Sequence, residues 1–234
     1  MHTSYHPDLQ KNDKNIILSS EESHHLVKVL RHTDGMKVQL MNGKGLKAEA
    51  IITLTHQKKC ELSILHIASQ EPENNQIHLA ICPTKNMDRL EWFIEKATEL
   101  GVDKITLLQC KNNERKIVKM ERLEKIVLSA TKQSQRFYKP ELIELTSFSK
   151  FIKQNPNGGL AHCYEVSESS IKTPLNTGNL NSPVLIGPEG DFTLDEVKEA
   201  LDNGYCAIDL GENRLRTETA ALFAVAHLAV LRNY

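Results

Sequence analysis

From residue 76 to the end, short apolar runs alternate with helical patterns, and this alternation constrains the fold most. Residues 77–82 and 104–109 have the pattern of buried strands, and the apolar residues between them recur at helical spacing up to Gly101, a helix-ending signal. The same criteria predict strands at 140–146, 160–164, 184–187 and 207–210, and helices at 119–134, 148–154, 194–201 and 217–231. Such a succession predicts a largely parallel sheet covered by helices on both faces, with ligands bound beyond the carboxyl ends of its strands.

The first 70 residues follow the two-residue period of β-strands instead. Ser19 and Glu22 have capping-box spacing and predict one helix, which runs to about Arg31. Alternating residues at 36–55, interrupted by a glycine-rich turn, predict a β-hairpin, and residues 59–68 predict a further strand. Several short strands with one helix are typical of a small barrel-like module.

A polar stretch at 69–75 separates the two patterns, since it contains a proline and has no periodicity. We therefore divide the chain into a small β domain at 1–72 and an α/β domain at 73–234. A length of 234 residues is sufficient for two domains of these sizes.

The composition excludes several classes of protein. The five cysteines stand singly, which favours reduced thiols in a cytoplasmic protein over a disulfide framework. No spacing of His, Cys and Asp resembles a metal site, so we expect no bound metal. No apolar run reaches the roughly 18–20 residues that cross a bilayer, and the first residues lack the pattern of a signal peptide, so we expect no membrane association.

The net charge of −1 is unevenly distributed along the chain. Residues 85–140 carry thirteen Lys and Arg against eight Asp and Glu, whereas residues 141–234 carry seven against thirteen. A polyanion such as RNA would therefore meet the first two-thirds of the chain rather than its acidic last third. A solvated helix surface also explains the basic stretch, and charge alone favours that explanation.

Two loops in the last third follow predicted strands and have residues suited to a ligand. In the first, the strand at 184–187 leads into Gly187-Pro-Glu-Gly190. The two glycines let the backbone approach a ligand, and the proline fixes one turn dihedral. A helix then opens at Thr193 or Asp195. A β-α turn with nothing bound explains this loop equally well.

The second loop follows the strand at 207–210 and carries Arg214 and Arg216. Thr217 is suited to cap the next helix, and Glu218 is suited to the positive end of that helix. These structural roles leave the two arginines unexplained in an otherwise acidic region. The helix that follows is apolar nearly all round, so it is either central to the core or packed against a partner chain.

Four segments, taken in order, resemble one family. They are K-N-M-D-R-L-E-W-F-I-E-K-A-T-E-L-G-V at 85–102, S-A-T-K-Q-S-Q-R at 129–136, V-L-I-G-P-E-G at 184–190 and L-R-T-E-T-A at 215–220. Together they resemble the RsmE family, bacterial SPOUT enzymes that methylate N3 of a specific uridine in 16S ribosomal RNA. H-H-L-V-K-V-L-R at 24–31 resembles the PUA-like module of the same family. The resemblance therefore runs the length of the chain.

The resemblance implies a C-terminal α/β trefoil-knot (SPOUT) methyltransferase domain preceded by a small PUA-like β-barrel domain that binds RNA. It also implies the cofactor S-adenosyl-L-methionine (AdoMet), held largely by backbone groups of three loops. The matching positions in this sequence are Cys163, Tyr164, Glu165, Gly187, Pro188, Glu189, Gly190, Leu210, Gly211, Asn213, Leu215 and Thr219. The chain departs from the family pattern at Asp191, where a second glycine is common.

The partners that the resemblance implies are 16S rRNA of the small ribosomal subunit and a second copy of the chain, paired through the knotted domain. Two alternatives stay open. A SPOUT enzyme could methylate another rRNA atom, such as a ribose 2′-oxygen or another base nitrogen. The chain could instead be an RNA-binding assembly factor without catalytic activity.

Methylation of N3 requires removal of a weakly acidic proton and stabilisation of the negative charge that is left on the base. We hypothesise that Arg216 stabilises this charge, because a fixed guanidinium is suited to a water-poor site. Glu189 or Glu218 could accept the proton, although each also has a structural explanation. The basic residues that we expect to contact RNA, mostly through phosphates, are Lys28, Arg31, Arg115, Lys116, Lys132 and Arg136.

Overall fold

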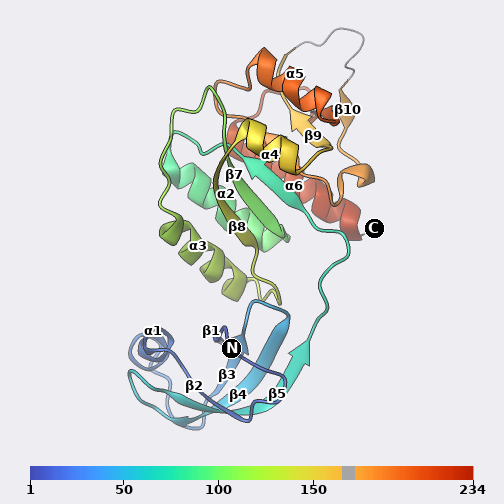
Figure 1. Ribbon diagram of the computed structural model, residues 1–234. Coiled ribbons are helices and arrows are strands. Elements are labelled where there is room, and N and C mark those ends of the chain that lie inside the picture. Colours follow the sequence, from blue (N-terminus) through green and yellow to red (C-terminus); the bar gives the residue numbers. More distant parts are fainter. Residues whose placement is uncertain (165–171, 234) are drawn as a thin grey trace. The chain divides into compact units, whose positions relative to one another are not determined.

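The computed structural model describes residues 1–164 and 172–233, and the chain divides into two compact units (Figure 1). The first unit comprises residues 1–73 and 131–139, and the second comprises residues 74–130 and 140–234. The first unit has one hydrophobic core, whereas the second has two.

A five-stranded mixed sheet forms the first unit, with strand order β1-β3-β4-β5-β2. Its strands are β1 (Thr3–Tyr5), β2 (Asn15–Ile17), β3 (Lys37–Met41), β4 (Leu46–Leu54) and β5 (Glu61–Ser69). Only β1 and β3 pair in parallel, and the other neighbours are antiparallel. The predicted hairpin is β3–β4, and the side-chain oxygen of Asn42 accepts hydrogen bonds from the backbone of Lys44 and Leu46 in its turn.

The helical segment of the first unit changes type along its length. α1 (Ser20–His24) begins at the predicted cap, where the Ser19 hydroxyl accepts a hydrogen bond of 3.2 Å from the Glu22 amide. It continues as the π-helical turn η1 (His25–Val29), which ends two residues before Arg31. Arg31 itself has a left-handed backbone with φ of 57°. A π-helical turn is uncommon, and no local sequence signal predicts one.

Residues 131–139 belong to the first unit, although we assigned them to the α/β domain from the sequence. Backbone hydrogen bonds join Gly45 to Phe137 and Lys139 to Gly43. The Tyr138 hydroxyl donates to the carbonyl of Gln70 at 2.8 Å. These contacts link segments far apart in the sequence, so the periodicity of the chain does not reveal them.

The second unit is built on a seven-stranded parallel sheet with strand order β10-β12-β9-β11-β6-β7-β8. Its strands are β6 (His78–Ile81), β7 (Lys104–Gln109), β8 (Glu141–Ser147), β9 (Gly158–Ala161), β10 (Thr173–Pro174), β11 (Val184–Ile186) and β12 (Tyr205–Asp209). The short edge strand β10 has no counterpart among the predicted strands. Its position beside β12 places the sheet edge next to the last strand of the chain.

Helices cover both faces of this sheet, as the alternation of strands and helices predicted (Figure 1). They are α2 (Met87–Leu100), α3 (Met120–Gln133), α4 (Phe148–Gln154), α5 (Leu194–Asp202) and α6 (Thr217–Asn233), with a 3-10 turn η3 at Thr177–Asn179. Side chains alternate between faces along β11, because Val184 and Ile186 join the core under α2, α3 and α6. Leu185 between them joins the core under α4 and α5.

The predicted helix ends are found where local chemistry specified them. α2 ends at Gly101, whose left-handed backbone has φ of 102°. α5 begins with a capping box between Thr193 and Glu196. Among the described residues, no helix combines the length and the apolar composition of a membrane span.

Candidate functional site

A cleft of ≈ 670 Å³ opens at the carboxyl ends of β9, β11 and β12. These three strands are neighbours in the sheet, so the loops that follow them meet at one edge. The lining residues are 161–163, 186–189 and 208–217, together with Lys172, Asp191 and Ala220. The cleft therefore unites the two glycine loops that were singled out in the sequence with a third loop after β9.

The turn at Gly187–Asp191 is closed by a hydrogen bond of 2.9 Å from the Asp191 amide to the Pro188 carbonyl. A Cβ on Gly187 would lie 3.0 Å from the ring of Phe192, so packing against that ring accounts for the glycine. A Cβ on Gly190 would make only an ordinary contact, at 3.4 Å from Asn112. The reason for Gly187 thus lies in the protein core rather than in the approach of a ligand.

Asp191 has a left-handed backbone with φ of 63°, a conformation that Asp tolerates better than most side chains. Its carboxylate accepts two backbone hydrogen bonds, from Phe192 at 2.7 Å and from Cys163 at 2.8 Å. The second bond crosses from the β11 loop to the β9 loop. Asp191 therefore joins two walls of the cleft.

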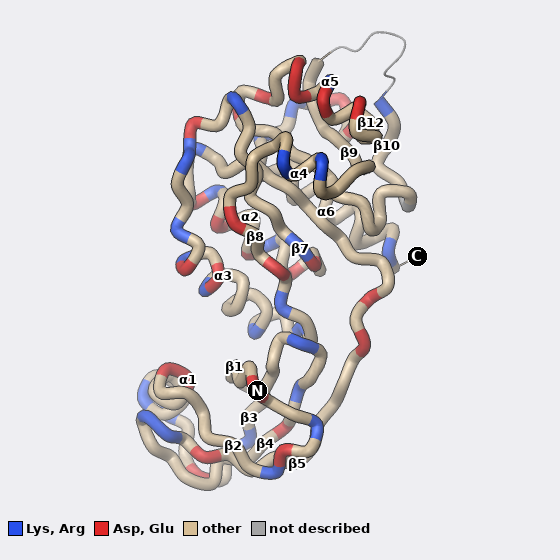
Figure 2. The backbone as a smooth tube through the Cα atoms, in the orientation of Figure 1, with Lys and Arg blue, Asp and Glu red and all other residues tan. Residues whose placement is uncertain are grey.

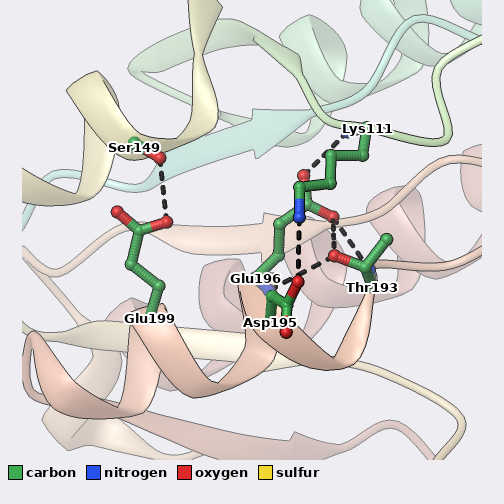
Figure 3. Close-up of polar contacts among 6 residues, drawn as sticks. All are labelled: Lys111, Ser149, Thr193, Asp195, Glu196 and Glu199. Carbon is green, nitrogen blue, oxygen red and sulfur yellow. Dashed lines mark hydrogen bonds and ion pairs between the residues drawn. The ribbon is translucent and has the colours of Figure 1, made fainter.

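The loop after β7 supports the β11 loop from the other side. The side-chain amide of Asn112 donates to the carbonyls of Gly190 and Asp191, at 3.2 and 3.0 Å. Figure 3 shows the neighbouring Lys111, whose backbone amide donates to the buried carboxylate of Glu196 at 2.7 Å. Because the other oxygen of Glu196 closes the capping box of α5, one carboxylate ties the β7 loop to the start of that helix.

Glu189 lies at the wall of the cleft, and its side chain is exposed. One of its carboxylate oxygens accepts a hydrogen bond of 2.9 Å from the backbone amide of Lys85. The loop that carries Lys85 is held in turn by Arg115, whose guanidinium donates to the carbonyls of Thr84 and Lys85 at 3.2 and 2.6 Å. Arg115 therefore supports the position of Glu189.

The loop between β12 and α6 presents four exposed side chains to the solvent or the cleft: Glu212, Asn213, Arg214 and Arg216. Gly211 has φ of 111°, and nothing lies within 4 Å of the place where its Cβ would be. A left-handed backbone explains this glycine, whereas packing does not.

α6 begins differently from the prediction that Thr217 caps it. The Arg216 carbonyl accepts the first helical hydrogen bond, from Ala220 at 2.8 Å. Thr217 is already helical and buried, and its hydroxyl donates to the carbonyl of Gly187 at 3.1 Å. The start of α6 is thus fastened to the β11 loop, which places the Arg216 side chain at the cleft.

Glu218 does not line the cleft. It is buried, and one of its oxygens lies 3.6 Å from the Arg89 guanidinium on α2. Its other oxygen is buried without a hydrogen-bond partner among the described residues. Of the two candidate proton acceptors, only Glu189 faces the cleft.

The predicted cofactor positions divide into those at the cleft and those away from it. The residues at the cleft are Cys163, Gly187, Pro188, Glu189, Leu210, Gly211, Asn213 and Leu215. Gly190, Tyr164 and Thr219 are not among its lining residues, and the Tyr164 hydroxyl instead donates to the Phe192 carbonyl at 2.7 Å. Glu165 lies outside the described residues.

His162 and Lys172 line the cleft, although nothing in the sequence pattern pointed to them. His162 is buried, and neither of its ring nitrogens has a hydrogen-bond partner among the described residues. Burial lowers the pKa of His162, the nearby Lys172 lowers it further, and Asp191 opposes this shift. The Lys172 ammonium donates to the His162 carbonyl at 2.7 Å. The two glycines near β9, Gly158 and Gly159, lie within the strand rather than in the loop after it, so they did not point to either residue.

The predicted RNA-binding residues differ in their availability. Lys28, Arg31 and Lys116 are exposed. Lys132 forms an ion pair of 2.8 Å with Glu22, and the guanidinium of Arg115 holds backbone carbonyls as described above. Arg136 is partly buried. Within the described part of the chain, no group of three or more His, Cys, Asp or Glu could hold a metal ion.

Comparison with known proteins identifies the family. The profile of the RNA methyltransferase domain matches residues 71–229, and that of the RNA methyltransferase PUA domain matches residues 18–65. The ribosomal RNA small subunit methyltransferase E of Rickettsia conorii is 31% identical over 97% of this chain and 93% of its own length. The Bacillus subtilis protein of the same name is 26% identical over 91% and 88%.

A solved structure agrees over nearly the whole chain. The crystal structure of ribosomal RNA small subunit methyltransferase E from Neisseria gonorrhoeae, bound to S-adenosyl methionine, superposes with a TM-score of 0.82 at 27% identity. It covers 99% of this chain and 98% of its own. The predicted fold class, a SPOUT-type α/β domain after a PUA-like module, is confirmed. By sequence profile, full-length relatives and fold, the chain belongs to the ribosomal RNA small subunit methyltransferase E family.

Proposed function

We propose that this protein transfers a methyl group from AdoMet to N3 of a specific uridine in the 16S rRNA of the small ribosomal subunit. The observation that carries the proposal is the cleft, which three strand-end loops form and which both Glu189 and Arg216 line. The names of the relatives support small-subunit rRNA as the substrate. The order of the four sequence motifs supports N3 of uracil as the acceptor atom.

The residues of the cleft fit AdoMet in size and chemistry. Its volume of ≈ 670 Å³ lies within the range of about 300–1,000 Å³ that is usual for small-molecule sites. Apolar side chains such as Ile186, Ile208 and Leu210 suit the adenosine part of the molecule. The unpartnered ring nitrogens of His162 and the charges of Lys172 and Asp191 suit polar groups. When bound, AdoMet supplies a methyl group that is already electrophilic.

Arg216 stabilises the negative charge that forms on the uracil ring when N3 loses its proton. Its side chain is exposed at the cleft, and its backbone carbonyl is fixed by the first hydrogen bond of α6. A guanidinium is always charged and can donate several hydrogen bonds, so it is suited to stabilise the charge once the base is bound.

Glu189 accepts the N3 proton in this proposal. It lies at the cleft, and the hydrogen bond from the Lys85 amide orients its carboxylate. Glu218 has the other candidate carboxylate, but its ion pair with Arg89 and its place outside the cleft suit a structural role at the start of α6. A general base must reach the proton that it removes, so position favours Glu189.

RNA is held by exposed cations on both units. Lys28 and Arg31 on the first unit and Lys116 on the second are the predicted residues whose side chains are exposed. The backbone in Figure 2 shows acidic residues gathered along α5, a helix that we therefore expect to avoid phosphate. Contacts of this kind give affinity without sequence choice, so the acceptor uridine is selected at the cleft.

The protein acts as a homodimer through its second unit. α6 exposes two large apolar side chains, Phe223 at 45% and Val230 at 56%, which are seven residues apart and therefore lie on one face. Light scattering of the purified protein should give twice the mass of the chain, and Phe223→Glu should lower that mass by half. A monomeric wild-type protein would refute the dimer.

Two measurements test the proposed function. Calorimetry should give heat on titration with AdoMet, whereas a non-catalytic RNA-binding factor should give none. Incubation with small ribosomal subunits and AdoMet labelled in its methyl group should transfer the label to 16S rRNA. Subunits in which the acceptor uridine is already methylated are the matched control and should take up no label. A protein that binds AdoMet but labels neither subunits nor free rRNA would overturn the proposal.

A further inference from the structure

We infer that Asp191 is a positioning residue that joins the β9 and β11 loops and thereby sets the affinity of the cleft for AdoMet. The inference rests on the proposed function, since it concerns the same cleft.

The geometry of Asp191 satisfies two donors at once. One carboxylate oxygen accepts from the Phe192 amide at 2.7 Å and the other from the Cys163 amide at 2.8 Å. The first bond stabilises the left-handed backbone of the turn, and the second ties that turn to the end of β9. Both bonds are to a charged acceptor, which makes them stronger than hydrogen bonds between neutral groups.

The backbone of the same residue is held from the opposite side. The Asp191 carbonyl and the Gly190 carbonyl share the amide donor of Asn112, and the Asp191 amide donates to Pro188. With its main chain fixed in this way, the carboxylate has a defined direction toward the β9 loop. Asp191 also lines the cleft, so a shift of its side chain changes the wall that a ligand meets.

The link has a consequence for how AdoMet is held. The backbone amide of Cys163 is occupied by Asp191 and is not available to a ligand. The β9 loop then contributes its other groups, among them the unpartnered ring nitrogens of the neighbouring His162. Loss of the carboxylate would free the Cys163 amide but would also release the loop from its position.

Two substitutions distinguish the effect of the carboxylate hydrogen bonds from the effect of the backbone conformation at position 191. Asp191→Asn keeps the size of the side chain and tolerates the left-handed φ, but it offers one acceptor oxygen where two donors need one each. Asp191→Gly keeps the backbone freedom and removes both bonds. The matched control is Asp195→Asn, which changes an exposed carboxylate that pairs with Lys111 and does not line the cleft.

Calorimetry with AdoMet and with its demethylated product, S-adenosylhomocysteine, measures the effect on the folded protein. Asp191→Asn should bind both molecules about tenfold more weakly, the loss expected for one charged hydrogen bond, and Asp191→Gly, which lacks both bonds, should bind them at least as weakly. Asp195→Asn should stay within about twofold of the wild type, as is usual for exposed ion pairs. In kinetics, the KM for AdoMet should rise in the Asp191 variants while kcat at saturating AdoMet changes little.

Hydrogen exchange of backbone amides tests the link without any ligand. The Cys163 and Phe192 amides should exchange slowly in the wild type, and at least one of them should exchange faster in Asp191→Asn. A merely structural role would instead speed exchange throughout the second unit and lower its melting temperature.

Unchanged AdoMet affinity in both Asp191 variants would overturn the inference. A wild type that binds no AdoMet would overturn the proposed function instead, so the two failures are distinguishable.

Discussion

The two loops that bear the glycine motifs differ in how they are held. The β11 loop, 187–193, is fixed by Asn112, by the Cys163 amide and by the hydroxyls of Tyr164 and Thr217. In the β12 loop, 210–216, the Gly211 amide donates to the Asp209 side chain at 3.0 Å, and among the described residues no other side-chain hydrogen bond holds this loop. Its arginines are exposed.

The difference suggests that the two loops have different roles in the same cleft. A loop with many partners has a fixed shape and can provide the walls against which a cofactor is aligned. A loop with exposed charged side chains can adapt to the RNA and place Arg216 on the base. The β11 loop is therefore the framework, and the β12 loop provides the group that acts on the acceptor.

The largest effect is expected for Arg216→Ala. Turnover should fall by about 10²–10³, the usual cost of removing one donor that stabilises a developing negative charge. Affinity for AdoMet should not change, because the framework is untouched. Arg214→Ala, in the same loop, is the control and should reduce turnover far less. Near-normal turnover of Arg216→Ala with normal RNA affinity would contradict the claim that the β12 loop provides the group that acts on the acceptor.

Glu189→Gln should lower kcat by about 10², within the range for loss of a general base. The amide oxygen of Gln can still accept the hydrogen bond from Lys85, so the loop should keep its shape. Single-turnover rates on small subunits measure the chemical step. If Glu218→Gln had the larger effect on that step, Glu189 would not be the proton acceptor.

Glu196→Ala removes a carboxylate that joins the start of α5 to the loop after β7 (Figure 3). Because Glu196 is buried and accepts from Thr193 and Lys111, we expect a loss of about 2–3 kcal/mol in the free energy of unfolding. Asp195→Ala, which breaks an exposed ion pair with Lys111, should cost less than about 1 kcal/mol. Equal losses in urea unfolding would mean that the framework does not depend on Glu196.

The features that the sequence predicted are those that depend on residues close together in the chain. The caps at Ser19, Gly101 and Thr193 depend on residues within one turn, and each was found where its local pattern placed it. The alternation of strands and helices predicted the parallel sheet, because burial on both faces leaves continuous apolar runs. The two glycine loops were likewise identified from strand ends.

The contacts that build the site connect distant segments, and no local pattern encodes them. Asp191 reaches Cys163, and Glu189 reaches Lys85, across 28 and 104 positions of the chain. The expectation that Thr217 caps α6 was wrong because the helix already begins at Thr217, whose hydroxyl donates to the Gly187 carbonyl, 30 positions away. His162 was missed because an isolated histidine in a strand end carries no motif.

Acid should destabilise the fold through His162, the residue that follows β9. The pKa of His162 is lowered from 6.5 by burial, so the folded protein keeps it neutral while the unfolded chain takes up a proton. The contribution of His162 to stability is therefore fully present above the pKa of the histidine in the unfolded chain. It is lost as pH falls below that pKa, by at most about 1.4 kcal/mol per pH unit for one group. The thermal unfolding temperature of His162→Gln should depend less on pH than that of the wild type at pH values below this pKa. An identical pH dependence would assign the proton uptake to other groups.

The smallest effect concerns the exposed cations. RNA affinity should fall steeply with salt, and Lys28→Ala should reduce the slope of log affinity against log salt by about one. Lys132→Ala removes a cation that already pairs with Glu22, so the slope should change less. Filter binding at several salt concentrations measures both. A larger change for Lys132 would mean that its ion pair opens when RNA binds.

The most direct test identifies the modified atom. Small ribosomal subunits are incubated with AdoMet and either the wild type or Arg216→Ala, and the 16S rRNA is digested to nucleosides for mass spectrometry. We predict that the wild type produces N3-methyluridine at one position and that Arg216→Ala produces almost none in the same time. A methyl group on a ribose oxygen or on another base would contradict the account.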